Sequence, residues 1–368
     1  MDQYVLENIF SWLPTRSLLR FQSVCKTWNS IISDRISSSD FRDVHLDRIL
    51  KNPDKLSHSI LITSPTAALG YNACLSSKDN AGFRYNACLS NKDVEKAWKY
   101  LPKPAGVHSN SFRLIGSYNG LICLHDEHFN IVLWNPCMGL YETVEKNFPL
   151  DEVCKTSKHY SFCGFGPNSS AAGGYVIVLG YHSYLILNAM DNKLGRYMWK
   201  NIQNIRSYNV FESIGVLVNG NLHWPASGLV VVSYNLNEQK LREFRAPTKS
   251  KSGQFWEQEK EFRVGNFREK LFVIFKADSK FEIWILEDNG VRKIWKWLFN
   301  IEGLVVLHDI LVPLGFLKNG DIIIEVDRRF IAQYSFAYKV MKVLKQLPGG
   351  GTNTSAISFV ETLAIPSN

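Results

Sequence analysis

The sequence lacks the features that mark membrane proteins and nucleic-acid-binding proteins. No apolar run reaches the length of about 18 residues that a membrane span needs, and the opening "MDQYVLENIF" has no signal-peptide pattern. No block of about five like charges occurs, and the 42 basic and 34 acidic residues are scattered. A scattered basic excess is typical of a solvated surface. We therefore expect neither a membrane nor a nucleic acid as a partner.

Cysteine is present but without a disulfide or metal pattern. The chain of 368 residues has 7 cysteines and no Cys-x-x-Cys motif. A chain of this length can bury a large core without disulfide bonds. Reduced thiols are the simplest interpretation, and they predict a cytoplasmic and/or nuclear protein.

Motifs for catalysis and cofactor binding are also missing. The Gly-rich stretches lack the Gly-Lys-Ser/Thr ending of a phosphate loop, and neither Gly-x-Ser-x-Gly nor His-Glu-x-x-His occurs. Cys123, His125 and His128 lie close together in "CLHDEH", but a zinc site needs a fourth ligand of matching spacing, and a polar turn is the favoured interpretation. We expect no metal, no cofactor and no catalytic residue, although an enzyme that gathers residues from distant segments stays possible in principle.

The N-terminal residues are predicted to form two helices, until "SDRISSSD" at 33–40 breaks the pattern. Apolar residues recur at three- and four-residue steps from Val5 to Leu13, and Pro14 ends that helix. A longer second helix is predicted from the spacing of Leu18, Phe21, Cys25, Trp28 and Ile32.

The apolar stripe of these helices is wider than two short helices can cover. A partner helix pair is expected to complete the core, in the manner of a helix in a groove. The alternative is that this face packs on the rest of the chain, and Cys25 and Ile32 are the candidates for that contact.

The remainder, 41–368, is predicted to be all β. Short apolar runs such as "NIVLW", "YVIVLGY" and "FEIWIL" are separated by turn signals. Asn-Gly pairs tolerate positive φ at both positions and predict hairpins. They occur at Asn119-Gly120, Asn219-Gly220, Asn289-Gly290 and Asn319-Gly320.

A repeat of about 50 residues runs through this region. Each unit opens with an apolar residue and a glycine before its first strand, at Gly116, Gly164, Gly215, Gly265 and Gly315. Four short strands per unit are typical of kelch-like propeller blades. An irregular β-sandwich with coincidental spacing is the alternative.

A sixth unit is predicted from the two ends of the β region. "RDVHLD", "SILIT" and "YNACL" near 42–75 would supply strands, and "AISFVETL" at 356–363 would pair with them. Such closure removes the exposed edges of an open array. The predicted fold is therefore a small all-α region followed by a six-unit kelch-like β-propeller closed by the C-terminal strand.

One segment is duplicated within the predicted sixth unit. "YNACLSSKD" at 71–79 recurs as "YNACLSNKD" at 85–93. The repeat predicts a duplication in a surface loop, or alternatively an additional binding hairpin.

The N-terminal residues resemble an F-box. The resemblance rests on "VLENIFSWLPTRSLLRFQSVCKTWNSIISD", with Leu13-Pro14, the Ser-Leu-Leu-Arg-Phe step at 17–21, the Val-Cys-Lys-x-Trp core at 24–28 and the closing pair of isoleucines at 31–32. The sequence departs from the family at its start, where Met1-Asp2 replaces a first Leu-Pro. That departure implies weaker docking or a gene model that begins late.

The rest resembles the F-box-associated domain of plant F-box proteins. The matching stretches are "GSYNGLICL…NIVLWNP", "GVLVNGNLHW", "FEIWILEDNGVRKIWKWLFNI" and "PLGFLKNGDIIIE". Together the two resemblances divide the chain into an F-box at 1–38 and a substrate-recognition domain at 41–368.

The resemblance implies a non-catalytic substrate adaptor of a Skp–cullin–F-box ubiquitin ligase. The F-box would dock the Skp-family adaptor and through it a cullin, and the β domain would capture an unknown target protein. A free propeller interaction module that no longer assembles into a ligase is the alternative. The residues expected to bind the adaptor are Val5, Leu6, Ile9, Leu13, Pro14, Leu18, Leu19, Phe21, Val24, Trp28 and Ile31.

Overall fold

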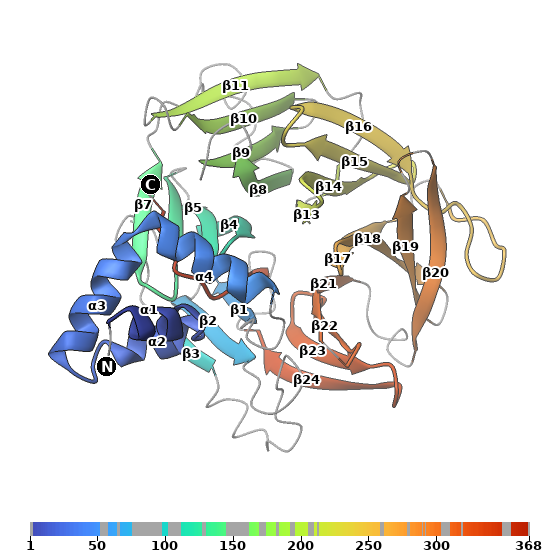
Figure 1. Ribbon diagram of the computed structural model, residues 1–368. Coiled ribbons are helices and arrows are strands. Elements are labelled where there is room, and N and C mark those ends of the chain that lie inside the picture. Colours follow the sequence, from blue (N-terminus) through green and yellow to red (C-terminus); the bar gives the residue numbers. More distant parts are fainter. Residues whose placement is uncertain are drawn as a thin grey trace.

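The computed structural model describes residues 3–51, 58–64, 67–75, 98–101, 112–126, 130–144, 162–168, 174–181, 184–191, 196–204, 210–211, 213–257, 261–277, 280–288, 290, 292–302, 310–317, 319–347 and 355–366. Within these residues the helices come first and all strands follow (Figure 1). The second copy of the duplicated segment, 85–93, lies outside them. The first five residues of the first copy belong to a strand, β2, rather than to a surface loop.

The helical region is longer and more divided than the sequence predicts. Its helices are α1 (Gln3–Ser11), α2 (Thr15–Phe21), α3 (Lys26–Ser37) and α4 (Ser39–Lys51). The single long helix predicted through Cys25 is wrong, because Cys25 is extended and caps α3, its Sγ accepting the Trp28 N–H at 3.4 Å.

The stretch "RDVHLD", predicted as a strand, lies in α4. Its alternation of polar and apolar residues suggested a strand, but His45 and Ile49 are one helical turn apart and both are buried. Asp40 in the first turn and Arg48 in the last suit the helix dipole. The β region therefore begins after α4, and not at residue 41.

The described strands form six separate sheets (Figure 1). In the order of hydrogen-bonded neighbours they are β25 (Ser355–Val360), β1 (His58–Ser64), β2 (Ala67–Leu75) and β3 (Trp98–Leu101); β4 (Phe112–Tyr118), β5 (Leu121–Asp126), β6 (Ile131–Asn135) and β7 (Leu140–Val144); β11 (Arg196–Asn204), β10 (Tyr184–Asp191), β9 (Gly174–Tyr181), β8 (Phe162–Asn168) and β12 (Ser213–Ile214); β13 (Val216–Val218), β14 (Asn221–Ala226), β15 (Val230–Asn235) and β16 (Lys240–Arg245); β17 (Phe262–Phe267), β18 (Lys270–Ala277), β19 (Lys280–Asp288) and β20 (Lys293–Glu302); β21 (Leu311–Phe316), β22 (Ile322–Val326), β23 (Phe330–Ser335) and β24 (Val340–Gln346).

The sheets stand around a common centre in a propeller-like arrangement (Figure 1). The C-terminal strand β25 pairs antiparallel with β1, with Leu61 opposite Ile357. The predicted pairing of "AISFV" with "SILIT" is therefore confirmed. The prediction that "RDVHLD" is a strand of this sheet is wrong. The additional strand is β3, which pairs with β2.

The Asn-Gly turns join strands as predicted. Both residues of Asn119-Gly120 and of Asn219-Gly220 have positive φ, and these turns connect β4 to β5 and β13 to β14. Gly290 and Gly320 also have positive φ, between β19 and β20 and between β21 and β22.

The glycines of the repeat mark places where neighbouring side chains press against the inner strands. A Cβ on Gly116 would lie 2.7 Å from the Cβ of Phe165 in the next sheet. A Cβ on Gly164 would lie 2.7 Å from Leu222, again one sheet further on. Gly315 is different, because a Cβ there meets nothing within 4 Å. Close packing between sheets therefore explains the glycine at Gly116 and Gly164, whereas a Cβ on Gly265 would first meet Phe272 of its own sheet.

The end of the chain joins the propeller to the helices. Leu363, which follows β25, is buried in one cluster with Leu6, Phe10, Leu18 and Ile32. The alternative that the helical face packs on the rest of the chain is thus correct for these residues. Ile32 makes that contact as predicted, whereas Cys25 is exposed.

Hydrogen bonds and an ion pair fix the same junction. The Thr15 hydroxyl donates to the Glu361 carbonyl at 2.8 Å, and Arg16 pairs with the buried Glu361 carboxylate at 2.7 Å. On the propeller side the Asn135 amide donates to the carbonyls of Thr362 and Ala364 at 3.0 and 2.8 Å. Residues 361–364 therefore connect the two regions: Glu361 binds the helices, and the carbonyls of Thr362 and Ala364 bind the propeller.

Candidate functional site

Helix α1 is apolar on two sides. Leu6 and Phe10 are buried in the helical core. The rings of Phe10 and Trp28 pack there in a T-shaped arrangement, with 5.3 Å between their centroids. Val5, Ile9 and Trp12 follow the i, i+4, i+7 spacing of a second stripe and are 44%, 46% and 43% exposed. A helix that is apolar on two adjacent sides can bury one side in its own domain and leave the other side for a neighbour.

The turn before α3 adds to the exposed apolar surface. Val24 is 59% exposed, and Trp28 is half-buried beside Phe21, with 5.3 Å between the two ring centroids. Glu7 of α1 accepts a hydrogen bond from Arg35 of α3 at 2.6 Å, and this bond lowers the pKa of Glu7. The carboxylate thus holds α1 against α3 at ordinary pH.

The structure divides the residues expected to bind the adaptor into three groups. Val5, Ile9 and Val24 are exposed, while the partly buried members are Leu13, Pro14, Leu19, Phe21 and Trp28. The buried members, Leu6, Leu18 and Ile31, pack in the protein's own core. These three side chains support the packing of the helices, and the expectation that they bind the adaptor stays a prediction.

Two exposed aromatic residues were missed. Trp12 carries the outer stripe of α1 one turn further and lies under the Arg48 guanidinium, 4.5 Å from its carbon. The helical period of the sequence could have identified Trp12. Tyr4 is 74% exposed beside Val5, where the family pattern has an acidic residue. We call the exposed side chains Tyr4, Val5, Ile9, Trp12 and Val24 the α1 surface.

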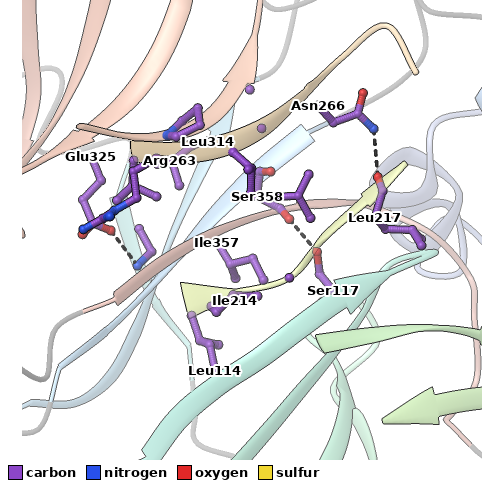
Figure 2. Close-up of a pocket in the computed structure, with 18 of the residues that line it drawn as sticks. Leu114, Ser117, Ile214, Leu217, Arg263, Asn266, Leu314, Glu325, Ile357 and Ser358 are labelled. Carbon is purple, nitrogen blue, oxygen red and sulfur yellow. Dashed lines mark hydrogen bonds between the residues drawn. The ribbon is translucent and has the colours of Figure 1, made fainter. Parts of the chain in front are cut away.

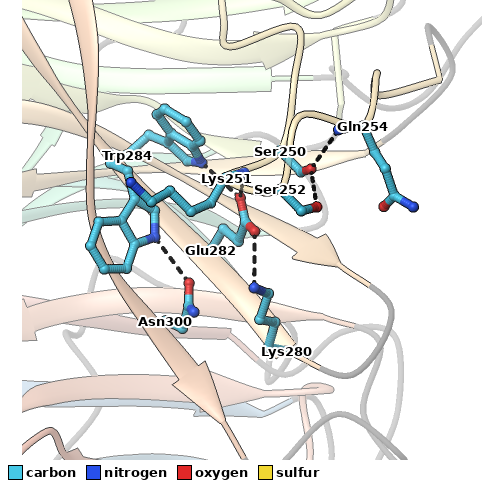
Figure 3. A network of polar contacts seen from close by, with 9 residues as sticks. Ser250, Lys251, Ser252, Gln254, Lys280, Glu282, Trp284 and Asn300 are labelled. Carbon is cyan, nitrogen blue, oxygen red and sulfur yellow. Dashed lines mark hydrogen bonds and ion pairs between the residues drawn. The ribbon is translucent and has the colours of Figure 1, made fainter.

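The propeller presents a separate ordered loop on its outer side, 246–257 (Figure 3). Glu282 on β19 is fully buried and accepts hydrogen bonds from the Lys251 backbone at 2.8 Å and the Trp284 indole at 3.2 Å. Lys280 lies 3.4 Å from its other oxygen. One carboxylate therefore holds the loop on the sheet and leaves Phe255 exposed at its end.

Metal and membrane features are not found where the structure can be assessed. Among the described residues no group of three or more His, Cys, Asp or Glu side chains is placed to hold a metal ion. No helix in the same residues is long and apolar enough to cross a membrane. His223 is buried in its sheet, and burial lowers its pKa to about 4.

Comparison with known proteins identifies both regions. Residues 1–39 match the F-box domain, and residues 85–345 match the F-box associated beta propeller domain. The second match covers more than half of the chain. This chain belongs to the family of F-box proteins with an F-box associated beta propeller domain.

Individual F-box relatives resemble the chain over most of its length. The F-box/kelch-repeat protein At3g23880 of Arabidopsis thaliana is 22% identical over 90% of this chain and 86% of its own length. The F-box protein At3g07870 of the same plant is 24% identical over 91% and 84%. Among solved structures, a DUF4784 family protein from Bacteroides caccae has a TM-score of 0.44 at 11% identity, over 82% of this chain and 73% of that one.

Proposed function

We propose that this F-box protein is the substrate-recognition adaptor of a Skp–cullin–F-box ubiquitin ligase. Its F-box helices bind a Skp-family adaptor through the α1 surface, and the adaptor connects it to a cullin. The propeller, closed as a six-sheet ring through β25, holds a target protein for ubiquitination. The protein itself supplies no catalytic group, and it acts in the cytoplasm or nucleus.

The observation that carries this proposal is the second apolar stripe of α1. Three large apolar side chains at helical spacing are each more than two fifths exposed, on the domain that matches the F-box. Covering such a stripe with a partner releases water from apolar surface at about 25 cal/mol per Å². The inner stripe is already covered by the protein's own core, so the outer one is the surface available to a partner.

The junction at residues 361–364 supports the same role. A ligase adaptor has to present its target at a defined distance from the catalytic subunit. The ion pair of Arg16 with Glu361 and the burial of Leu363 among the F-box helices fix the propeller relative to the α1 surface.

The first prediction concerns Ile9 at the centre of the α1 surface. Ile9→Asp places a charge in an interface that would otherwise be apolar, and we expect at least a tenfold loss of affinity for the Skp-family adaptor. Isothermal titration with the purified adaptor measures it. Val44→Asp is the matched control, since Val44 is 44% exposed on α4, outside the F-box match.

Circular dichroism should show unchanged helix content in both variants, because neither side chain is buried. Equal affinity of Ile9→Asp and the unchanged protein would rule out the α1 surface as the docking site. The alternative, a propeller module outside any ligase, predicts that even the unchanged protein fails to co-purify with the adaptor and a cullin.

A further inference from the structure

A cavity of about 350 Å³ lies among the innermost strands of the propeller (Figure 2). Residues of β4, β12, β13, β17, β21 and β25 line it. Pockets that bind small molecules in proteins measure about 300–1,000 Å³, so this cavity has room for one small ligand.

The walls of the cavity are largely apolar. They include Leu114, Ile214, Val264, Leu314 and Ile357. Two polar side chains of the wall already have partners: the Ser117 hydroxyl donates to the Ser358 carbonyl at 2.7 Å, and the Asn266 amide donates to the Leu217 carbonyl at 3.0 Å. These bonds connect neighbouring inner strands, and the charged side chains are left to determine which ligand is accepted.

Positive charge predominates among those side chains. Arg113, Arg263 and Arg328 line the cavity, against the single carboxyl group of Glu325. The side chain of Arg263 is only 17% exposed. It donates to its neighbour's carbonyl, Phe262 O, at 3.0 Å and to Glu261 at 3.2 Å, which occupies two of its five N–H groups.

Arg263 and Arg328 are close enough to influence each other. Burial lowers the pKa of Arg263, the ion pair with Glu261 opposes this effect, and the charge of Arg328 adds a smaller lowering. Arg113 and Arg328 have additional contacts of their own, so Arg263 is the residue on which the argument rests. The guanidinium group of Arg263 has N–H groups beyond the two that Phe262 and Glu261 occupy, and a carboxylate in the cavity can accept hydrogen bonds from them.

Glu325 neutralises this charge only in part. It is 4% exposed, and its carboxylate accepts the Ala356 backbone N–H at 3.0 Å. Burial raises the pKa of Glu325 to about 7, so a protonated fraction persists near neutral pH. Figure 2 shows Glu325 and Arg263 on the same side of the cavity.

We propose that the central cavity binds a small organic carboxylate, its apolar body against the inner-strand walls and its carboxylate on Arg263. A guanidinium group matches a carboxylate in a bidentate geometry, which gives both affinity and orientation. The singly charged carboxylate suits a cavity of mixed apolar and basic lining better than a phosphate dianion does, because less charge is desolvated. This binding site goes beyond the adaptor function and does not depend on assembly of the ligase.

The test titrates the full chain with hexanoate, benzoate and 4-phenylbutyrate, each beside the alcohol of the same skeleton. At least one carboxylate is expected to bind tenfold more tightly than its alcohol. Arg263→Gln should reduce that binding at least tenfold, because the amide keeps the size but loses the charge. Arg242→Gln, an exposed position on β16 outside the cavity, should leave it unchanged.

A second variant fills the cavity without changing its charge. Gly315 lines the cavity, and a Cβ there meets nothing within 4 Å, so Gly315→Met should fold and block the ligand. The proposal is overturned if no carboxylate binds better than its alcohol, or if binding survives in both Arg263→Gln and Gly315→Met.

The same carboxylate chemistry could come from an acidic side chain of a target protein. A hexapeptide with a central Glu, titrated against its Gln counterpart as a competitor, separates the two sources. Displacement by the Glu peptide alone assigns the site to a target's side chain, and no displacement by either peptide assigns it to a free acid.

Discussion

At the scale of single residues, Glu325 shows that a side chain can link two sheets at a cost that depends on pH. Its carboxylate accepts a hydrogen bond from β25 while it is buried on β22. Burial raises the pKa from an ordinary 4.5 to about 7. Between these pH values the folded protein keeps a proton that the unfolded chain has released. The free energy of unfolding therefore falls as pH rises through this window.

We predict that Glu325→Gln stabilises the protein at pH 8 and has little effect near pH 4.5. The amide oxygen can still accept the Ala356 N–H, but no charge has to be buried. At about 1.4 kcal/mol per pKa unit, the gain at pH 8 is of order 2–3 kcal/mol. Urea unfolding at the two pH values measures it.

Glu243→Gln, at an exposed position on β16, is the control and should change stability little at either pH. A Glu325→Gln protein that is less stable than the unchanged one at pH 8 would show that the ionised carboxylate is required.

At the scale of elements, two glycines of the repeat differ in their surroundings: one is packed tightly against the next sheet and the other borders open space. Gly116 and Gly315 both lie on innermost strands, at corresponding positions of the repeat. A Cβ on Gly116 would approach the Phe165 Cβ to 2.7 Å and its backbone nitrogen to 3.0 Å, and neither atom can rotate away.

Gly116→Ala should therefore destabilise the protein by about 1–3 kcal/mol, the usual cost of overpacking a core. Gly315→Ala should be neutral, because its Cβ meets nothing. Thermal unfolding of the two variants tests the difference, and equal melting temperatures would refute this account of the repeat.

The elements that the sequence predicts correctly are those with local signals. The turns at Asn119-Gly120 and Asn219-Gly220 have positive φ at both residues, and Gly116 and Gly164 of the repeat lie where neighbouring sheets approach closely. The helical spacing of Val5 and Ile9 is likewise a local pattern, and both side chains are exposed on α1, while their binding to an adaptor stays a prediction.

The errors arise where distant contacts decide the structure. The strand predicted at "RDVHLD" is a helix because burial of His45 against the Leu13 carbonyl, at 2.9 Å, favours a four-residue period over a two-residue one. The burial of Leu6 and Leu18 in one cluster with Leu363 could not be predicted either, because Leu363 lies more than 300 positions away. No local pattern reports such a contact.

At the scale of the whole molecule, the last strand and the residues after it hold two regions together. β25 pairs with β1, and Leu363 completes the core of the F-box helices. Truncation after Gly351 removes both contacts. It exposes the edge of β1 and leaves an apolar gap among the helices, so we predict an insoluble protein.

Leu363→Ala is the milder form of the same experiment and should cost about 2–5 kcal/mol, as buried leucines do. Truncation after Pro366 keeps both contacts and serves as the control. Soluble protein that melts cooperatively after truncation at Gly351 would contradict this account, and size-exclusion chromatography with thermal unfolding would reveal it.

The position of Leu363 in the F-box core has a consequence for synthesis. A ribosome makes the F-box helices well before Leu363, whereas domains usually fold one after another while synthesis continues. Here the F-box helices cannot complete their core until the propeller strands that precede Leu363 have been translated. A prematurely terminated chain would therefore carry an unfinished F-box, and the contact that fixes the geometry of the finished protein also distinguishes complete molecules from incomplete ones.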